Sequence, residues 1–179
     1  MILALDISTS CTGWCIFNKD VLLDVGYIEL SRYKGMYEKA GHVKSELLKI
    51  HKKHSFDEVV VEENLQAFRP GLSSASTLMT LAQFNGVVRW ICYSDLNCQV
   101  SSLNVNSARK SVGLKIDRKS KKKTKEQVLE WVAIKESSIV WPEKILKSGP
   151  NKGKKRKLDS CYDMADAYVI GKAHFNLLK

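Results

Sequence analysis

The chain has 179 residues, of which 29 are Lys or Arg and 19 are Asp or Glu, and its net charge at neutral pH is +10. One domain over residues 1–179 is typical of this length, and 44% hydrophobic residues exclude a wholly disordered chain. No stretch approaches the roughly 18 uncharged apolar residues of a membrane span, and Asp6 interrupts the N-terminal apolar run before it could act as a signal peptide. We therefore expect a cytoplasmic protein without a membrane partner.

The first third of the sequence predicts three strands and a helix. Residues 2–6 are an apolar run, and residues 13–18 and 21–30 are rich in β-forming residues on either side of a turn-like Asn-Lys-Asp. Short connections of this kind favour an antiparallel meander. Apolar residues at helical spacing follow over 36–53.

The rest of the chain alternates strands with helices. The segment 56–63 contains a strand at Val59–Val61, and 98–103 is a short fifth strand. Helical patterns occupy the residues 73–93, 106–112, 124–136 and about 158–178. The order predicts an α/β fold: a mixed five-stranded sheet, made of the meander and two β-α units, with helices on both faces.

Several carboxylates interrupt apolar patterns. Asp6 ends the first strand and Glu62 ends the fourth, while Asp159, Asp163 and Asp166 share one face of the last predicted helix. Carboxylates in such places are costly unless they meet a cation. Hard oxygen ligands suit Mg²⁺ or Mn²⁺, and two such ions support phosphodiester hydrolysis.

The positive charge lies in one stretch. Between Arg109 and Lys157 there are 17 Lys or Arg residues and 5 Asp or Glu residues, whereas the remainder is slightly acidic. The densest parts, 115–125 and 147–157, are interpreted as flexible basic insertions. A solvated surface is the simplest explanation of one lysine run, but two runs in one domain favour a nucleic-acid partner.

Three motifs carry a resemblance to a known family. The motifs are ILALDISTSCTGW at 2–14, VVVEENL at 59–65 and YDMADAYVIG at 162–171. They resemble the acidic motifs of RuvC-type Holliday junction resolvases, in the RNase H-like (retroviral integrase) superfamily, and the resemblance extends from residue 1 to about 174. It implies an RNase H-like fold and a metal-dependent endonuclease that resolves four-way junctions by paired symmetric nicks, with other branched DNA as further candidate substrates.

The resemblance also implies roles for individual residues. Asp6, Glu62, Asp163 and Asp166 match the catalytic, metal-binding residues, which hold two Mg²⁺ or Mn²⁺ ions per active site. Arg109 and Lys125 match basic residues near the scissile phosphate. The other residues expected to bind DNA are Leu65, Phe68, Lys110, Lys121, Lys122 and Lys123. Leu65 stands where bacterial members carry an aromatic wedge, so stacking is lost and a strict sequence preference is not expected.

The resemblance also implies a homodimer, because members of the family are homodimeric. We expect a phage-encoded member that acts in the cytoplasm of its host. The helix predicted over 73–93 is the expected interface, because Phe84, Trp90 and Tyr93 add aromatic residues to a broad apolar stripe.

Two other functions remain open. The DISTSCTG segment also resembles the phosphate loop of the actin/Hsp70/sugar-kinase superfamily, which implies an ATP-handling domain. A non-catalytic DNA-binding protein with an RNase H-like fold is the third interpretation. Within the site, the pattern leaves open whether Asp159 or His174 joins the carboxylates.

Overall fold

A computed structural model of the protein describes residues 1–63 and 74–177, and the residues Leu65 and Phe68 lie outside that part. The strands are β1 (Ile2–Ile7), β2 (Cys11–Asn18), β3 (Val21–Glu29), β4 (Glu58–Glu62), β5 (Gln99–Leu103), β6 (Glu143–Ile145) and β7 (Lys155–Lys157). The helices are α1 (Met36–His54), α2 (Ala75–Ser94), α3 (Val105–Ser111), α4 (Thr124–Lys135) and α5 (Ser160–Leu177). None of the described helices is long and apolar enough to cross a membrane.

The main sheet has the strand order β3-β2-β1-β4-β5. Strands β1, β2 and β3 form the antiparallel meander expected from their short connections. Strand β4 pairs in parallel with β1, and β5 pairs in parallel with β4, because a helix precedes each of them. The prediction of an α/β fold with a mixed five-stranded sheet is confirmed.

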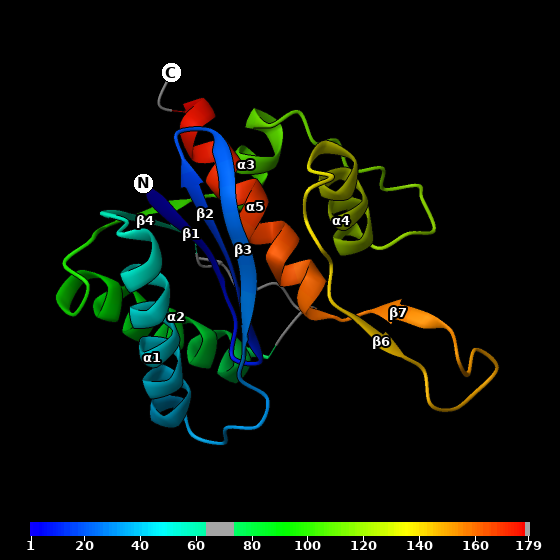
Figure 1. Ribbon diagram of the computed structural model, residues 1–179, viewed down its shortest axis with the longest axis horizontal. Helices are drawn as coiled ribbons and strands as arrows, with labels where there is room; N and C mark the ends of the chain where they lie inside the picture. The colour runs from blue at the N-terminus through cyan, green and yellow to red at the C-terminus, as the bar shows by residue number, and fades with distance from the viewer. Residues whose placement is uncertain (64–73, 178–179) are drawn as a thin grey trace.

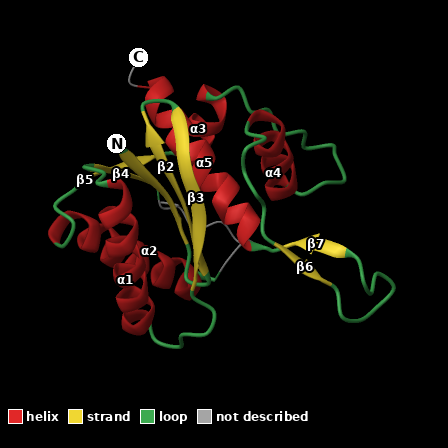
Figure 2. Ribbon diagram, viewed as in Figure 1, coloured by secondary structure: helices red, strands yellow, loops and turns green. Residues whose placement is uncertain are grey.

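Helices cover both faces of this sheet (Figure 1 and Figure 2). Alternation along β1 and β4 sends Ala4 and Val60 into the core beneath α5, and sends Leu5 and Val61 into the core beneath α1 and α2. Helices α3 and α4 pack against α5. Helix α5 is therefore a central element, and its N-terminal half is rich in buried residues such as Met164 and Ala165.

The two basic segments have more structure than flexible insertions would. Strands β6 and β7 form an antiparallel hairpin apart from the main sheet, so much of 147–157 belongs to an ordered element. The segment 115–125 is tied to α4, since Gln127 accepts from the Asp117 amide at 2.9 Å and donates to the Asp117 carbonyl at 3.0 Å. The sequence pattern missed the hairpin because its strands are three residues long and highly charged.

Helix α2 uses its apolar residues in two ways. Phe84 is completely buried against the sheet, so it is not available as the interface residue predicted from the sequence. Trp90 and Tyr93 are 63% and 62% exposed, and their rings lie 5.8 Å apart. One face of the helix thus fills the core, and the other presents two aromatic side chains to the surface.

Candidate active site

Two strands bring the first pair of carboxylates together. Strands β1 and β4 are parallel, and Leu5 is paired with Val61. Asp6 is the residue after Leu5 and Glu62 is the residue after Val61, so both lie at the same end of the sheet. Because side chains alternate along a strand, both lie on the face that α5 covers. The register of two buried strands therefore places these side chains side by side.

Helix α5 supplies the second pair. Asp163 and Asp166 lie in its first turns, three residues apart, and therefore share a face. The helix approaches β2 closely at Gly13, where a Cβ atom would overlap the main-chain carbonyl of Asp163. Since Gly13 is paired with Asp6 in the sheet, this contact sets the start of α5 beside the strand that carries Asp6.

The strand-end carboxylates resist ionisation. Burial raises the pKa of Asp6 well above its usual value, and the charges of Asp166, Glu62 and Asp163 raise it further. Burial raises the pKa of Glu62 to about 7; Asp166 adds to this effect and Arg109 opposes it. The four carboxylates thus act on one another electrostatically.

The helix carboxylates have partners that favour their charged forms. Burial raises the pKa of Asp163 to about 6, although a hydrogen bond from the Cys11 thiol opposes the rise. Burial also raises the pKa of Asp166, against the influence of Arg109. Arg109, at the end of α3, donates from Nη2 to Asp166 Oδ1 at 3.2 Å, and both side chains are mostly buried. Arg109 is therefore a cation already present in the site.

The chemistry of the donor set fits a divalent cation. Four carboxylates that repel one another and are partly desolvated would gain from a hard cation, which offsets both costs. Within residues 1–63 and 74–177, no three His, Cys, Asp or Glu side chains are grouped as a preformed metal site. The four carboxylates therefore supply the negative charge that a cation needs, and their side chains would have to move closer together to coordinate it.

Comparisons with solved structures identify the fold. Thermus thermophilus RuvC in complex with a Holliday junction substrate is similar over 99% of this chain and 93% of its own, with a TM-score of 0.66 and 16% identity. A second Thermus thermophilus RuvC structure matches 99% of this chain and 94% of its own, with a TM-score of 0.62 and 16% identity. The protein has the RuvC fold.

The yeast mitochondrial Holliday junction resolvase Ydc2 is also similar, over 98% of this chain and 77% of its own, with a TM-score of 0.55 and 15% identity. The sequence matches no protein-family model and no curated protein. At such low identities, the shared property is the RuvC fold.

Two residues that the sequence left open lie outside the carboxylate cluster. Asp159 precedes α5 and is exposed, and its Oδ1 accepts from Arg156 at 3.2 Å. His174 is buried near the other end of α5, with Nε2 3.1 Å from Glu58 Oε1. Glu58 begins β4 whereas Glu62 ends it, so His174 belongs to the opposite end of the sheet.

The predicted DNA-binding lysines lie on α3 and around the start of α4. Lys125 Nζ lies 4.3 Å from the ring centroid of Tyr162, the residue before Asp163. Lys122 pairs with Glu130 at 2.7 Å, and Lys121 and Lys123 are exposed beside it. Exposed Lys110 lines a cavity of about 310 Å³ with Arg109. Lys125 is the lysine of this group that acts on the carboxylates, because it opposes the rise in the pKa of Asp163.

The structure adds residues that the sequence pattern did not single out. A cavity of about 160 Å³ is lined by Asp6, Glu62, Ser8 and Asn85 among others. Asn85 comes from α2 and is buried, and its Oδ1 accepts no hydrogen bond from the described residues. A polar residue on the core side of α2 was the available signal, because an apolar residue is expected there.

Proposed function

We propose that this protein is a metal-dependent, structure-selective endonuclease that resolves Holliday junctions, and other branched DNA, by paired symmetric nicks. The observation that carries the proposal is the meeting of Asp6, Glu62, Asp163 and Asp166 at one end of the sheet, next to basic surface, in a chain with the RuvC fold. Carboxylates suit metal binding, while lysines suit the phosphate backbone.

The four carboxylates would hold two Mg²⁺ or Mn²⁺ ions. When bound, such ions activate a water molecule and stabilise the departing 3′ oxygen. The raised pKa values support this assignment, because the chain keeps costly carboxylates where no described lysine pairs with Asp6 or Glu62. Arg109 orients Asp166 through a hydrogen bond, and the Cys11 thiol favours the charged form of Asp163 by opposing the rise in its pKa.

Arg109 and Lys125 supply positive charge on the α5 side of the cluster. Arg109 reaches Asp166, and Lys125 is close enough to Asp163 to lower its pKa. We expect these cations to attract the scissile phosphate and to limit repulsion between it and the carboxylates. The surface lysines, Lys110 and Lys121 to Lys123, would contact phosphates farther away.

Two scissile strands in one junction call for two active sites, which a two-fold dimer provides. Helix α2 is the proposed interface. Its exposed side carries Met79, Trp90 and Tyr93, which are 65%, 63% and 62% exposed. Large apolar and aromatic residues are enriched in the cores of interfaces, so this side is better suited to a second copy than to solvent.

A nicking assay tests the proposed function. Synthetic four-way, three-way and linear duplex DNA would be incubated with the protein in Mg²⁺, Mn²⁺ or EDTA. We expect symmetric nicks in the four-way junction with either metal, weaker cutting of the three-way junction, and none in EDTA. Inertness on every branched substrate with either metal would contradict the proposal and leave the non-catalytic alternative.

The same assay addresses the ATP-handling alternative, which no feature of residues 1–63 and 74–177 favours. Cleavage that needs metal and proceeds equally with and without ATP is the expected result. Cleavage that required ATP would favour the actin-like interpretation instead.

A further inference from the structure

The β6–β7 hairpin projects from the body of the protein between α4 and α5 (Figure 1). Its pairing runs from Glu143 with Lys157 to Ile145 with Lys155. It continues beyond the strands, because the Leu146 amide donates to the Lys154 carbonyl at 3.0 Å and the Gly153 amide donates to the Leu146 carbonyl at 2.8 Å. The ladder thus extends toward the tip.

The hairpin is anchored at its base and has a defined turn. The Leu158 amide donates to the Pro142 carbonyl at 2.9 Å, and the Cys161 thiol donates to the same carbonyl at 3.4 Å. Gly149 and Gly153 have φ angles of +82° and +85°, which glycine adopts without strain. These contacts describe a structured arm joined to the first turn of α5.

The charge of this arm is almost entirely positive. Residues 143–157 include seven Lys or Arg residues and a single Glu. Two of them form ion pairs, Lys155 with Glu143 at 3.7 Å and Arg156 with Asp159 at 3.2 Å. Within the described chain, Lys144, Lys147 and Lys152 form no ion pair. So many like charges on one small element repel one another unless a polyanion lies alongside.

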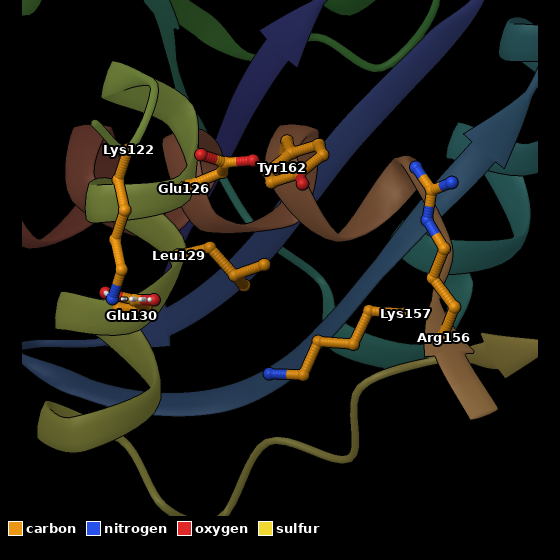
Figure 3. A pocket seen from close by; sticks show the side chains of 7 residues that line it. All are labelled: Lys122, Glu126, Leu129, Glu130, Arg156, Lys157 and Tyr162. Atoms are coloured by element: carbon orange, nitrogen blue, oxygen red, sulfur yellow. Dashed lines mark hydrogen bonds and ion pairs between the residues drawn. The ribbon is translucent and has the colours of Figure 1, made fainter. Parts of the chain in front are cut away.

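The base of the arm adjoins the candidate active site. A cavity of about 400 Å³ lies between β7, α4 and α5, and it is lined by Arg156, Lys157, Lys122 and Tyr162 among others. Figure 3 shows Lys122 on one side of the cavity and Arg156 and Lys157 on the other. Tyr162 directly precedes Asp163. The two basic segments, distant in sequence, therefore meet at the start of α5, the helix that carries Asp163.

We infer that the β6–β7 hairpin is a DNA-binding arm that follows the phosphate backbone of one duplex arm of the substrate, outward from the cleavage site. The inference deepens the proposed function and rests on it. The five residue steps from Lys152 to Lys157 span at most roughly 18 Å. That length is about half of the ~34 Å helical turn of B-DNA. The tip lysines would thus reach phosphates up to about five base pairs beyond the base of the arm.

A thermodynamic cycle between the arm and the phosphates tests this inference. The arm variant is Lys144→Ala/Lys147→Ala/Lys152→Ala in the full chain. The control variant is Lys44→Ala/Lys49→Ala/Lys52→Ala, which removes the same charge from α1 on the other side of the sheet. Affinity is measured by fluorescence anisotropy in EDTA, for a four-way junction with ordinary phosphates and for one with neutral methylphosphonates three to eight nucleotides from the crossover.

On the ordinary junction, we expect the arm variant to bind at least tenfold more weakly at 0.1 M salt. Its slope of log K against log salt should be smaller by about 2 to 3, since each phosphate that the protein neutralises contributes about 0.9. Neutral phosphates should weaken the parent and the control variant but leave the arm variant within threefold of its own value, because those contacts are already absent.

An equal response of the arm variant and the parent to the neutral phosphates would overturn the inference, and so would equal losses of affinity in the arm and control variants. Failure of the proposed function is a separate outcome, because it is read from the metal-dependent nicking of the parent. Binding that depends on the arm, without any nicking by the parent, would support the inference about the arm and contradict the proposed nuclease function.

Discussion

Gly13 in β2 faces the main-chain carbonyl of Asp163 in α5, and a side chain at Gly13 would overlap that carbonyl. The contact joins the strand paired with Asp6 to the helix that carries two of the four carboxylates. Because the obstructing atoms belong to the backbone, they cannot turn aside as a flexible side chain would. A single missing methyl group thus sets the distance between the two halves of the site.

We therefore expect Gly13→Ala to impair both stability and cleavage. Overpacking of this kind costs about 1–3 kcal/mol, which corresponds to a fall in Tm of roughly 2–12 °C for a domain of this size. Cleavage should fall at least tenfold at temperatures where the variant remains folded. Gly41→Ala in α1 is the matched control, because a Cβ atom there meets nothing within 4 Å. An active, fully stable Gly13→Ala protein would show that the contact does not position Asp163.

Neutral replacements of the carboxylates should separate cleavage from binding. We expect Asp6→Asn, Glu62→Gln and Asp166→Asn each to abolish junction nicking, because each removes a proposed metal ligand. Binding should stay within about threefold of the parent, since the loss of a negative charge also reduces repulsion of phosphate. Asp163→Asn should behave in the same way, because exposed Asp159 is not positioned to substitute for it.

The control for these variants is Asp159→Asn, which removes a carboxylate from the same region of the chain. We expect it to cut at the parental rate in the nicking assay. If one of the four site variants cut at that rate, the residue it replaces would not be a ligand of the proposed metal site.

The raised pKa of Glu62 predicts a pH-dependent gain in stability for Glu62→Gln. The folded state holds this proton more tightly than the unfolded state, since the pKa rises from 4.5 to about 7. The resulting stabilisation is complete below pH 4.5 and is lost as the pH rises through 7. In EDTA at pH 8, the Gln variant should therefore have the higher Tm, by roughly 2–8 °C for about 1–2 kcal/mol.

Two further measurements check this prediction. The difference in Tm should shrink as the pH falls from 7 and should vanish near pH 4. Excess Mg²⁺ at pH 8 should reverse the order, because an ion that binds only the folded parent stabilises it. A Tm difference independent of both pH and Mg²⁺ would mean that Glu62 is not an ionisable member of the site.

The lysines at the start of α4 should contribute to the salt dependence of binding. Replacing Lys121, Lys122 and Lys123 by Ala should weaken binding to junctions and linear duplexes alike, because phosphate contacts carry no sequence or branch information. The slope of log K against log salt should fall by about 0.9 for each phosphate that these lysines neutralise in the parent. A slope equal to that of the parent would identify the run as solvated surface, and the α1 lysine variant serves again as the control.

The exposed side of α2 predicts a dimer. Light scattering at micromolar concentration should give a mass of about 40 kDa, twice that of the 20.2 kDa chain. Trp90→Glu should yield monomers with little change in Tm, since this side chain is largely exposed. Ile134→Glu on α4, where the side chain is 81% exposed, should leave the dimer intact. A monomeric parent bound singly to each junction would exclude the proposed interface.

Apart from the β6–β7 hairpin, the order of strands and helices was predictable from the sequence because it depends on local patterns. The apolar run that ends at Asp6 and the Val59–Val61 run that ends at Glu62 each occupy a few neighbouring residues. Alternation and helical spacing are properties of such short windows. The carboxylates at strand ends stood out for the same reason, as did the pair Asp163 and Asp166 on one helical face.

Other features depended on contacts between distant residues. The ion pair of Arg109 with Asp166 joins α3 to α5. Asp159 lies outside the carboxylate cluster because it precedes α5, which begins at Ser160. Neither follows from spacing. The burial of Phe84, the exposure of Trp90 and the cavity residue Asn85 likewise depend on how α2 packs against the sheet.

The amino-acid sequence by itself determined the five strands of the main sheet, the five helices and the acidic residues at the strand ends, because backbone preference and hydrophobic period act within a few residues. Only the tertiary structure decided that the two basic segments lie together beside Tyr162, and that Gly13 allows α5 to pack closely against the sheet. Such meetings depend on strand register and helix packing, which are set by close contacts between residues far apart in the chain.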